Sequence, residues 1–135
     1  MYTTNLLEDA RQSHVECLAL AIRAEVYREM AVRSTGNMSG VPGSGNKAGK
    51  QERYIIPLVD IQRRLQAQLK RLDAVTKAAE RQIATLKNPR HRAVLSAYYL
   101  SIATWEEVAE ALHYDVRWVY KLRDEALEIL GKASA

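Results

Sequence analysis

The chain has 135 residues and a formal net charge of +4, and 47% of its residues are hydrophobic while 27% are charged. This length suits one domain, or a small domain with an extension. The lack of Phe and of alternating polar and apolar positions argues against a β-sheet protein and favours an all-α fold.

The single cysteine, Cys17, excludes a disulfide within the chain, and its place in an apolar run predicts a buried small hydrophobic side chain. That run is far shorter than the roughly 20 apolar residues that span a bilayer. The start of the chain also lacks the basic and apolar segments of a signal peptide. We therefore expect a cytoplasmic protein with no membrane partner.

A long amphipathic helix is predicted at the start of the chain. Asn5 and Glu8 have the spacing of an N-terminal capping box, and the helix is expected to run to about Arg33. Its apolar stripe, which is suited to packing against a partner helix, consists of Leu7, Ala10, His14, Cys17, Ala21 and Ala24.

A glycine-rich break is predicted over residues 34–50, which hold five of the six glycines. A phosphate-binding loop is not expected there, because Gln51 stands where that motif needs Ser or Thr and no strand precedes it.

A second long helix is predicted from about residue 51 to residue 86, with Pro57 in its first turn or at a kink. An imperfect coiled-coil seam with a spacing of seven runs along it through Leu58, Leu65, Leu72, Ala79 and Leu86. We expect the first helix to fold back against this seam, so that residues 1–86 form an antiparallel helical hairpin. A second copy of the protein, giving a homodimer, is the alternative partner. Residues 50–86 also carry eight basic and four acidic residues, on a face that contacts solvent, DNA or an acidic partner.

The C-terminal domain is predicted to begin at residue 87, with Asn88 as the N-cap of a helix and Pro89 at its first position. Arg90 and Arg92, together with His91, lie at the start of this helix and could reach a DNA phosphate. The apolar face of the helix is expected to support the motif that follows, through Val94, Leu95, Tyr98 and Tyr99.

Residues 104–130 predict two helices joined by a tight turn. Thr104 and Glu107 form a capping box, and Asp115 is a second N-cap. His113 takes the first turn position, where a helix-turn-helix usually has Gly with positive φ, and Gly131 is the expected stop. The buried faces are predicted to hold Val108, Ala109, Leu112, Val119, Leu122, Ala126, Leu127 and Leu130. This pattern favours a helix-turn-helix with the small Ala109 at the helix crossing, over an ordinary helical hairpin of a bundle.

The same stretch, TWEEVAEALHYDVRWVYKLRDEALEIL, resembles region four of bacterial sigma factors, whose helix-turn-helix reads the −35 promoter element. The shared residue types are at Thr104, Glu106, Glu107, Val108, Leu112, Ala126, Leu127 and Leu130. With the preceding segment, NPRHRAVLSAYYLSIATWEEVAEAL, and the long helical N-terminal half, the chain is similar to small phage-encoded, sigma-like transcription regulators. The resemblance implies binding to promoter DNA and contact with RNA polymerase in a bacterial host cell.

In a helix-turn-helix, the N-terminal part of the second helix enters the major groove of double-stranded DNA. The residues expected to contact DNA there are Val116, Arg117, Trp118, Tyr120 and Lys121. Arg117 is the best candidate to read a guanine, and Lys121 suits a base or a phosphate. Val116 suits a thymine methyl group and Tyr120 a phosphate or sugar, whereas Trp118 either contacts DNA or anchors the core. Sigma factors are richer in Arg at these positions, so their −35 specificity does not transfer.

No catalytic, cofactor-binding or metal-binding residues are predicted, because the three histidines are scattered and no nucleophile motif occurs. Our leading hypothesis is a sequence-specific, sigma-like transcription regulator that is not an enzyme. Residues 87–135 carry seven basic and seven acidic residues, so their net charge gives little affinity for DNA. Contact with RNA polymerase would supply the missing affinity. The alternatives are a helical protein that binds polymerase or another protein without reading DNA, and a DNA-packaging recognition subunit.

Overall fold

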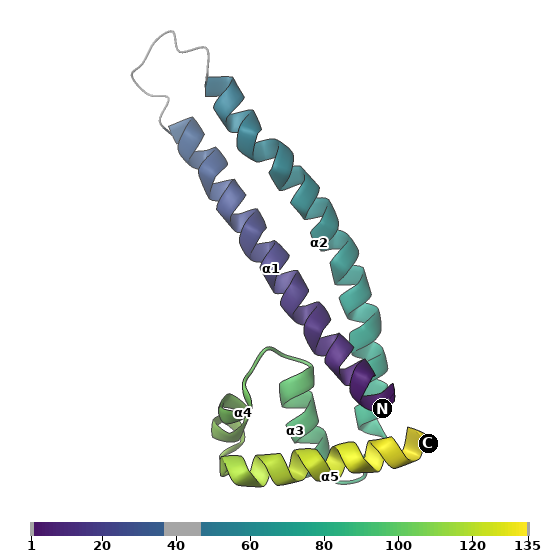
Figure 1. The fold of residues 1–135 in the computed structure, drawn as a ribbon. Coiled ribbons are helices and arrows are strands. Elements are labelled where there is room, and N and C mark those ends of the chain that lie inside the picture. Colours follow the sequence, from purple (N-terminus) through teal and green to yellow (C-terminus); the bar gives the residue numbers. More distant parts are fainter. Residues whose placement is uncertain (1, 37–46, 135) are drawn as a thin grey trace. The chain divides into compact units, whose positions relative to one another are not determined.

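The computed structural model describes residues 2–36 and 47–134, and within them every regular element is a helix. The helices are α1 (Tyr2–Gly36), α2 (Lys47–Ala84), α3 (Pro89–Tyr99), α4 (Trp105–Leu112) and α5 (Val116–Ser134), as Figure 1 shows. The predicted all-α class is therefore confirmed. The centre of the predicted glycine-rich loop, residues 37–46, lies outside the described residues.

The chain divides into two compact units. Unit 1 consists of residues 1–15 and 70–135, and unit 2 consists of residues 16–69, so α1 and α2 each contribute to both. The predicted domain boundary between residues 86 and 87 concerns independent folding and stays a prediction. The same holds for the pairing of the two whole helices in a hairpin.

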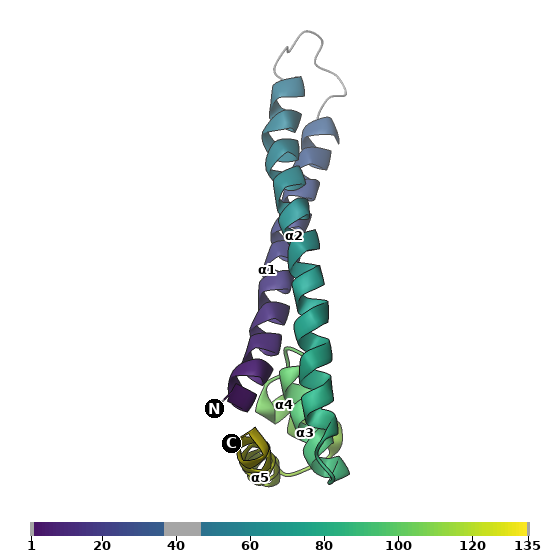
Figure 2. The same ribbon diagram turned by 90° about the vertical axis from the view of Figure 1, so that its right-hand side faces the viewer.

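Unit 2 has a narrow core of small side chains. On α1 the buried residues Cys17, Ala24 and Ala31 follow one another every seven residues, and on α2 Ile61 is buried. The two helical segments of this unit lie side by side in both views (Figures 1 and 2). Cys17 is 6% exposed, which confirms its prediction as a buried small hydrophobic residue.

The predicted seam on α2 is fully buried only at its C-terminal end. Ala79, near the end of α2, and Leu86, two residues after its last residue Ala84, are buried in unit 1. Leu58, Leu65 and Leu72 are half-buried. A Leu→Ala change costs about 2–5 kcal/mol at fully buried positions, so the three half-buried leucines should each contribute less.

Three predicted helix ends differ from the structure. Asn5 is not an N-cap, because α1 already begins at Tyr2. The second helix begins at Lys47 rather than at about residue 51, so Pro57 does not lie in its first turn, and the alternative that Pro57 kinks the helix stays a prediction. Gly131 does not end α5, which continues to Ser134. An ion pair of 3.3 Å between Glu128 and Lys132 spans this glycine at helical spacing and favours another turn of helix.

The core of unit 1 consists of two clusters that position the last three helices. The first cluster joins the start of α1 and the end of α2 to α3 and α5, through Leu7, Ala10, Ala79, Ile83, Leu86, Leu95, Tyr99, Ala126 and Leu130. The second joins α3, α4 and α5 through Val94, Val108, Ala109, Val119 and Leu122. Tyr98 and Trp105 are half-buried and pack against both clusters.

Candidate nucleic-acid interface

The start of α4 carries the predicted capping box. The Glu107 N–H donates to the Thr104 hydroxyl at 3.1 Å, and the Thr104 N–H donates to the Glu107 carboxylate at 2.9 Å. The bond from the Thr104 N–H to the carboxylate is the main cause that holds the pKa of Glu107 below its ordinary value, and the Thr104 hydroxyl lowers this pKa further. Because Thr104 and Glu107 satisfy each other's backbone groups, α4 has a defined first residue and direction.

The turn between α4 and α5 contains the expected left-handed residue. His113 has φ 59° and ψ 41°, and it alone among the described non-glycine residues has a positive φ. The Tyr114 N–H then donates to the Ala109 carbonyl at 2.8 Å, which closes the end of α4. After the turn, the Asp115 carboxylate accepts from the Arg117 N–H at 2.8 Å, as predicted for the N-cap of α5.

Replacing His113 tests the turn directly. A β-branched residue is strained at positive φ, so His113→Val should lower the free energy of unfolding by about 1–2 kcal/mol. Glycine adopts this conformation without strain, so His113→Gly should leave stability unchanged or raise it by up to about 1 kcal/mol. Urea unfolding measures both variants. Ala111→Gly, in the last turn of α4, is the control and should cost up to about 1 kcal/mol. A similar loss in His113→Gly would contradict the left-handed turn.

The crossing of α4 and α5 is closed by the small residue that the sequence predicts. Ala109 is 5% exposed and packs in the second cluster with Val119 and Leu122 of α5 and Val94 of α3. A methyl group at this position lets the two helices approach closely, and the larger Val108 and Leu122 belong to the same cluster.

The exposed start of α5 holds three of the five residues that we expected to contact DNA. Arg117, Trp118 and Lys121 are exposed, and the Lys121 ammonium lies 5.2 Å from the centre of the Trp118 ring. Trp118 is 36% exposed, so the alternative that it anchors the core is wrong. Val116 is half-buried against the second cluster, and Tyr120 is half-buried and donates to the Glu106 carboxylate at 3.1 Å.

The basic residues at the start of α3 have different surroundings from one another. Arg90 is exposed, while the Arg92 guanidinium donates to the carbonyls of Leu86 and Lys87 at 2.7 and 3.0 Å. Arg92 therefore stabilises the connection between α2 and α3. If Arg92 also contacts a DNA phosphate, as predicted, it must do so while it keeps these two bonds. His91 is 6% exposed and lies 3.1 Å from the Glu125 carboxylate, so its expected position facing a phosphate is wrong.

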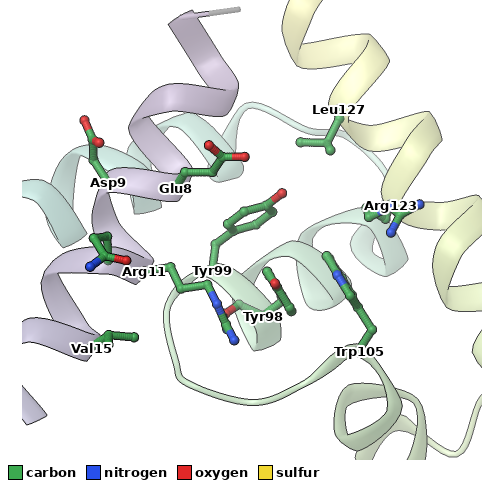
Figure 3. A pocket seen from close by; sticks show the side chains of 10 residues that line it. Glu8, Asp9, Arg11, Val15, Tyr98, Tyr99, Trp105, Arg123 and Leu127 are labelled. Atoms are coloured by element: carbon green, nitrogen blue, oxygen red, sulfur yellow. The ribbon is translucent and has the colours of Figure 1, made fainter.

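A column of cations and aromatic rings, which the sequence analysis missed, supports α4 and α5. Arg11 lies 3.9 Å from the centre of the Tyr98 ring, and Tyr98 stacks on Trp105 with ring centres 3.7 Å apart. Arg123 then lies 5.3 Å from the centre of the Trp105 ring and 4.8 Å from that of Tyr120. Figure 3 shows Arg11, Tyr98, Trp105 and Arg123 around one cavity.

Arg11 also binds the backbone that leads into α4. Its guanidinium donates to the Tyr98 carbonyl at 2.7 Å and to the Ser101 carbonyl at 3.2 Å. No local pattern could have indicated these bonds, because 87 or more residues separate the partners. Trp105 could have been found from the sequence, since a large aromatic residue directly after an N-cap needs a packing partner.

Comparisons with known protein families, curated proteins and solved structures found no match. Among the described residues, no three His, Cys, Asp or Glu side chains come together as metal ligands would. No helix in the same ranges is both long and apolar enough to cross a membrane.

Proposed function

We propose that this protein is a sequence-specific, sigma-like transcription regulator that binds promoter DNA through α4 and α5 and contacts bacterial RNA polymerase. The observation that carries the proposal is the segment from α4 to α5, with two capped helix starts and a left-handed residue between them. This arrangement leaves Arg117, Trp118 and Lys121 exposed at the start of α5. The resemblance to sigma factors supplies the promoter and the polymerase, and the protein acts as a regulator rather than as an enzyme.

The exposed side chains of α5 suit recognition in the major groove. Arg117 bonds a guanine with two N–H groups, and Lys121 contacts a base or a phosphate one helical turn later. The Lys121 ammonium near Trp118 presents a positive charge beside an apolar ring, which suits a sugar or a base edge. Half-buried Val116 and Tyr120 shape the same surface, and Arg90 adds a positive charge at the start of α3.

The charge balance of the C-terminal part makes polymerase contact a necessary element of the proposal. Residues 87–135 carry as many acidic as basic side chains, seven of each, so phosphate neutralisation gives little affinity. A protein that is held at the promoter by polymerase needs less affinity of its own for DNA.

A mobility-shift assay on DNA selected from a random pool tests the proposal. We expect one enriched sequence, weak binding by the protein alone and stronger binding when core RNA polymerase is present. Binding to polymerase with no enriched sequence would instead identify a helical interaction protein. A ring-like assembly that binds DNA without polymerase would identify a DNA-packaging recognition subunit.

Arg117→Ala should reduce binding to the selected site by about 1–3 kcal/mol and relax the choice at one base pair. The side chain is exposed, so the melting temperature should stay nearly unchanged. Fluorescence anisotropy on the selected site and on its single-base variants measures the affinity and the base preference. Arg28→Ala, an exposed arginine of unit 2, is the matched control. An equal loss of DNA affinity in both variants, or no loss in either, would show that Arg117 does not contact a base.

A further inference from the structure

A cavity of about 680 Å³ lies in unit 1, beside the column of cations and rings. Its size falls within the roughly 300–1,000 Å³ of typical small-molecule sites. The residues that line it come from α1, α3, α4 and α5, and Figure 3 shows the Tyr99 ring at its centre. Tyr99 is 5% exposed, so its ring forms a fixed floor rather than a mobile surface group.

Two opposite charges face this cavity without being paired to each other. Glu8 on α1 and Arg123 on α5 both line it, and Figure 3 shows them on opposite sides of Tyr99. No ion pair joins Glu8 to Arg123 in the part of the chain that the structure describes. Burial raises the pKa of the Tyr99 hydroxyl, and the charge of Glu8 raises it further while Arg123 lowers it, so both charges act on the cavity floor.

The other charged groups of the cavity are less available to a ligand. Arg11 is already bonded to two carbonyls and lies over Tyr98. Asp9 points away from Tyr99 in Figure 3. Arg123 pairs with Asp124 through its Nε atom at 2.8 Å, which leaves its terminal nitrogens for a second acceptor.

We propose that this cavity binds a small zwitterion of the amino-acid type that carries an apolar side chain. The ligand's ammonium group binds between the Glu8 carboxylate and the Tyr99 hydroxyl, and its carboxylate binds the terminal nitrogens of Arg123. The apolar side chain packs on the Tyr99 ring and on Leu127, which line the same cavity. This site goes beyond the proposed DNA-binding function, and its test uses no DNA, so either proposal can fail without the other.

The two tryptophans make a matched pair of reporters, because Trp105 lines the cavity and Trp118 does not. L-phenylalanine is the probe, titrated into the full chain while the two indole N–H signals are followed by NMR. We expect the Trp105 signal to shift and saturate at millimolar concentration or below, and the Trp118 signal to stay in place. No shift of Trp105 up to about 10 mM, or equal shifts of both signals, would overturn the proposal.

Removing single charges, first from the ligand and then from the protein, tests the binding mode. Phenethylamine lacks the carboxylate and 3-phenylpropanoate lacks the ammonium group, and each should bind about tenfold or more weakly than L-phenylalanine. Glu8→Gln and Arg123→Gln should each give a similar loss, whereas Glu128→Gln, on the exposed surface of α5, should bind as the unchanged chain does. Arg123→Lys keeps the charge and should retain more binding than Arg123→Gln, with helicity measured for every variant. Equal binding of all three probes would mean an apolar cavity that does not read charge, and would overturn the assignment.

Discussion

Leu95→Ala should lower the free energy of unfolding of unit 1 by about 2–5 kcal/mol, the range found for fully buried leucines. Leu95 is completely buried in the cluster that joins α3 to α5 and to the start of α1 and the end of α2. Removing three carbon atoms leaves a cavity. Several helices would have to move together to fill it, so little of the lost packing can be recovered. Urea unfolding followed by circular dichroism measures the loss of stability. Trp fluorescence is the second probe, and it reports on unit 1 because both tryptophans lie there.

Ile129→Ala is the matched control for this change. Ile129 lies on α5 but is 48% exposed, so its loss should alter stability by no more than about 0.5 kcal/mol. If both variants unfold at the same urea concentration, the first cluster is not the core that holds these helices together.

Ala109→Leu should destabilise unit 1 by about 1–3 kcal/mol, because three additional carbon atoms have to enter the packed crossing of α4 and α5. Ala109 is 5% exposed and is surrounded by Val94, Val108, Val119 and Leu122. Any relief of the overlap rotates α4 relative to α5. DNA binding, if α5 reads DNA as proposed, should therefore fall by more than the loss of folded protein explains.

Ala111→Leu tests the same substitution at an exposed position of the same helix. Ala111 is exposed, and leucine forms helices nearly as well as alanine, so stability and DNA binding should hardly change. A normal melting temperature for Ala109→Leu, with the loss appearing in Ala111→Leu instead, would show that the register of the crossing is shifted by two residues.

Short-range patterns were sufficient to predict the caps and the turn. Thr104 with Glu107, Asn88 with Pro89, and Asp115 each act through atoms two or three residues away, so their bonds follow from sequence spacing. Spacing alone did not identify every helix end, because Asn5 with Glu8 has the same spacing as Thr104 with Glu107 and yet lies inside α1. Asn5 and Gly131 have residue types that are common at helix ends, yet neighbouring turns continued the helix past both.

The candidate interface was predicted in outline, and exposure decided the details. The spacing of Val108, Ala109, Val119 and Leu122 identified the buried faces of α4 and α5, because a helix repeats every 3.6 residues. The remaining face had to be the exposed one. Periodicity alone could not tell which residues at the edge of the buried face are buried and which are exposed. The half-burial of Val116 and the exposure of Trp118 were therefore known only from the structure.

The sequence by itself determined the all-α class, the capped starts of α3, α4 and α5, and the left-handed turn at His113, because each depends on atoms within a few residues. Only the tertiary structure decided where α1 and α2 contribute to unit 1, and which cations lie over which rings. Arg11 reaches Tyr98 and Ser101 across 87 and 90 residues, and the cavity over Tyr99 needs side chains from four helices. Such contacts depend on how whole helices pack, and many pairings of apolar stripes satisfy the same local pattern. The packed side chains of unit 1 select one of those pairings, and no single stretch of sequence contains that information.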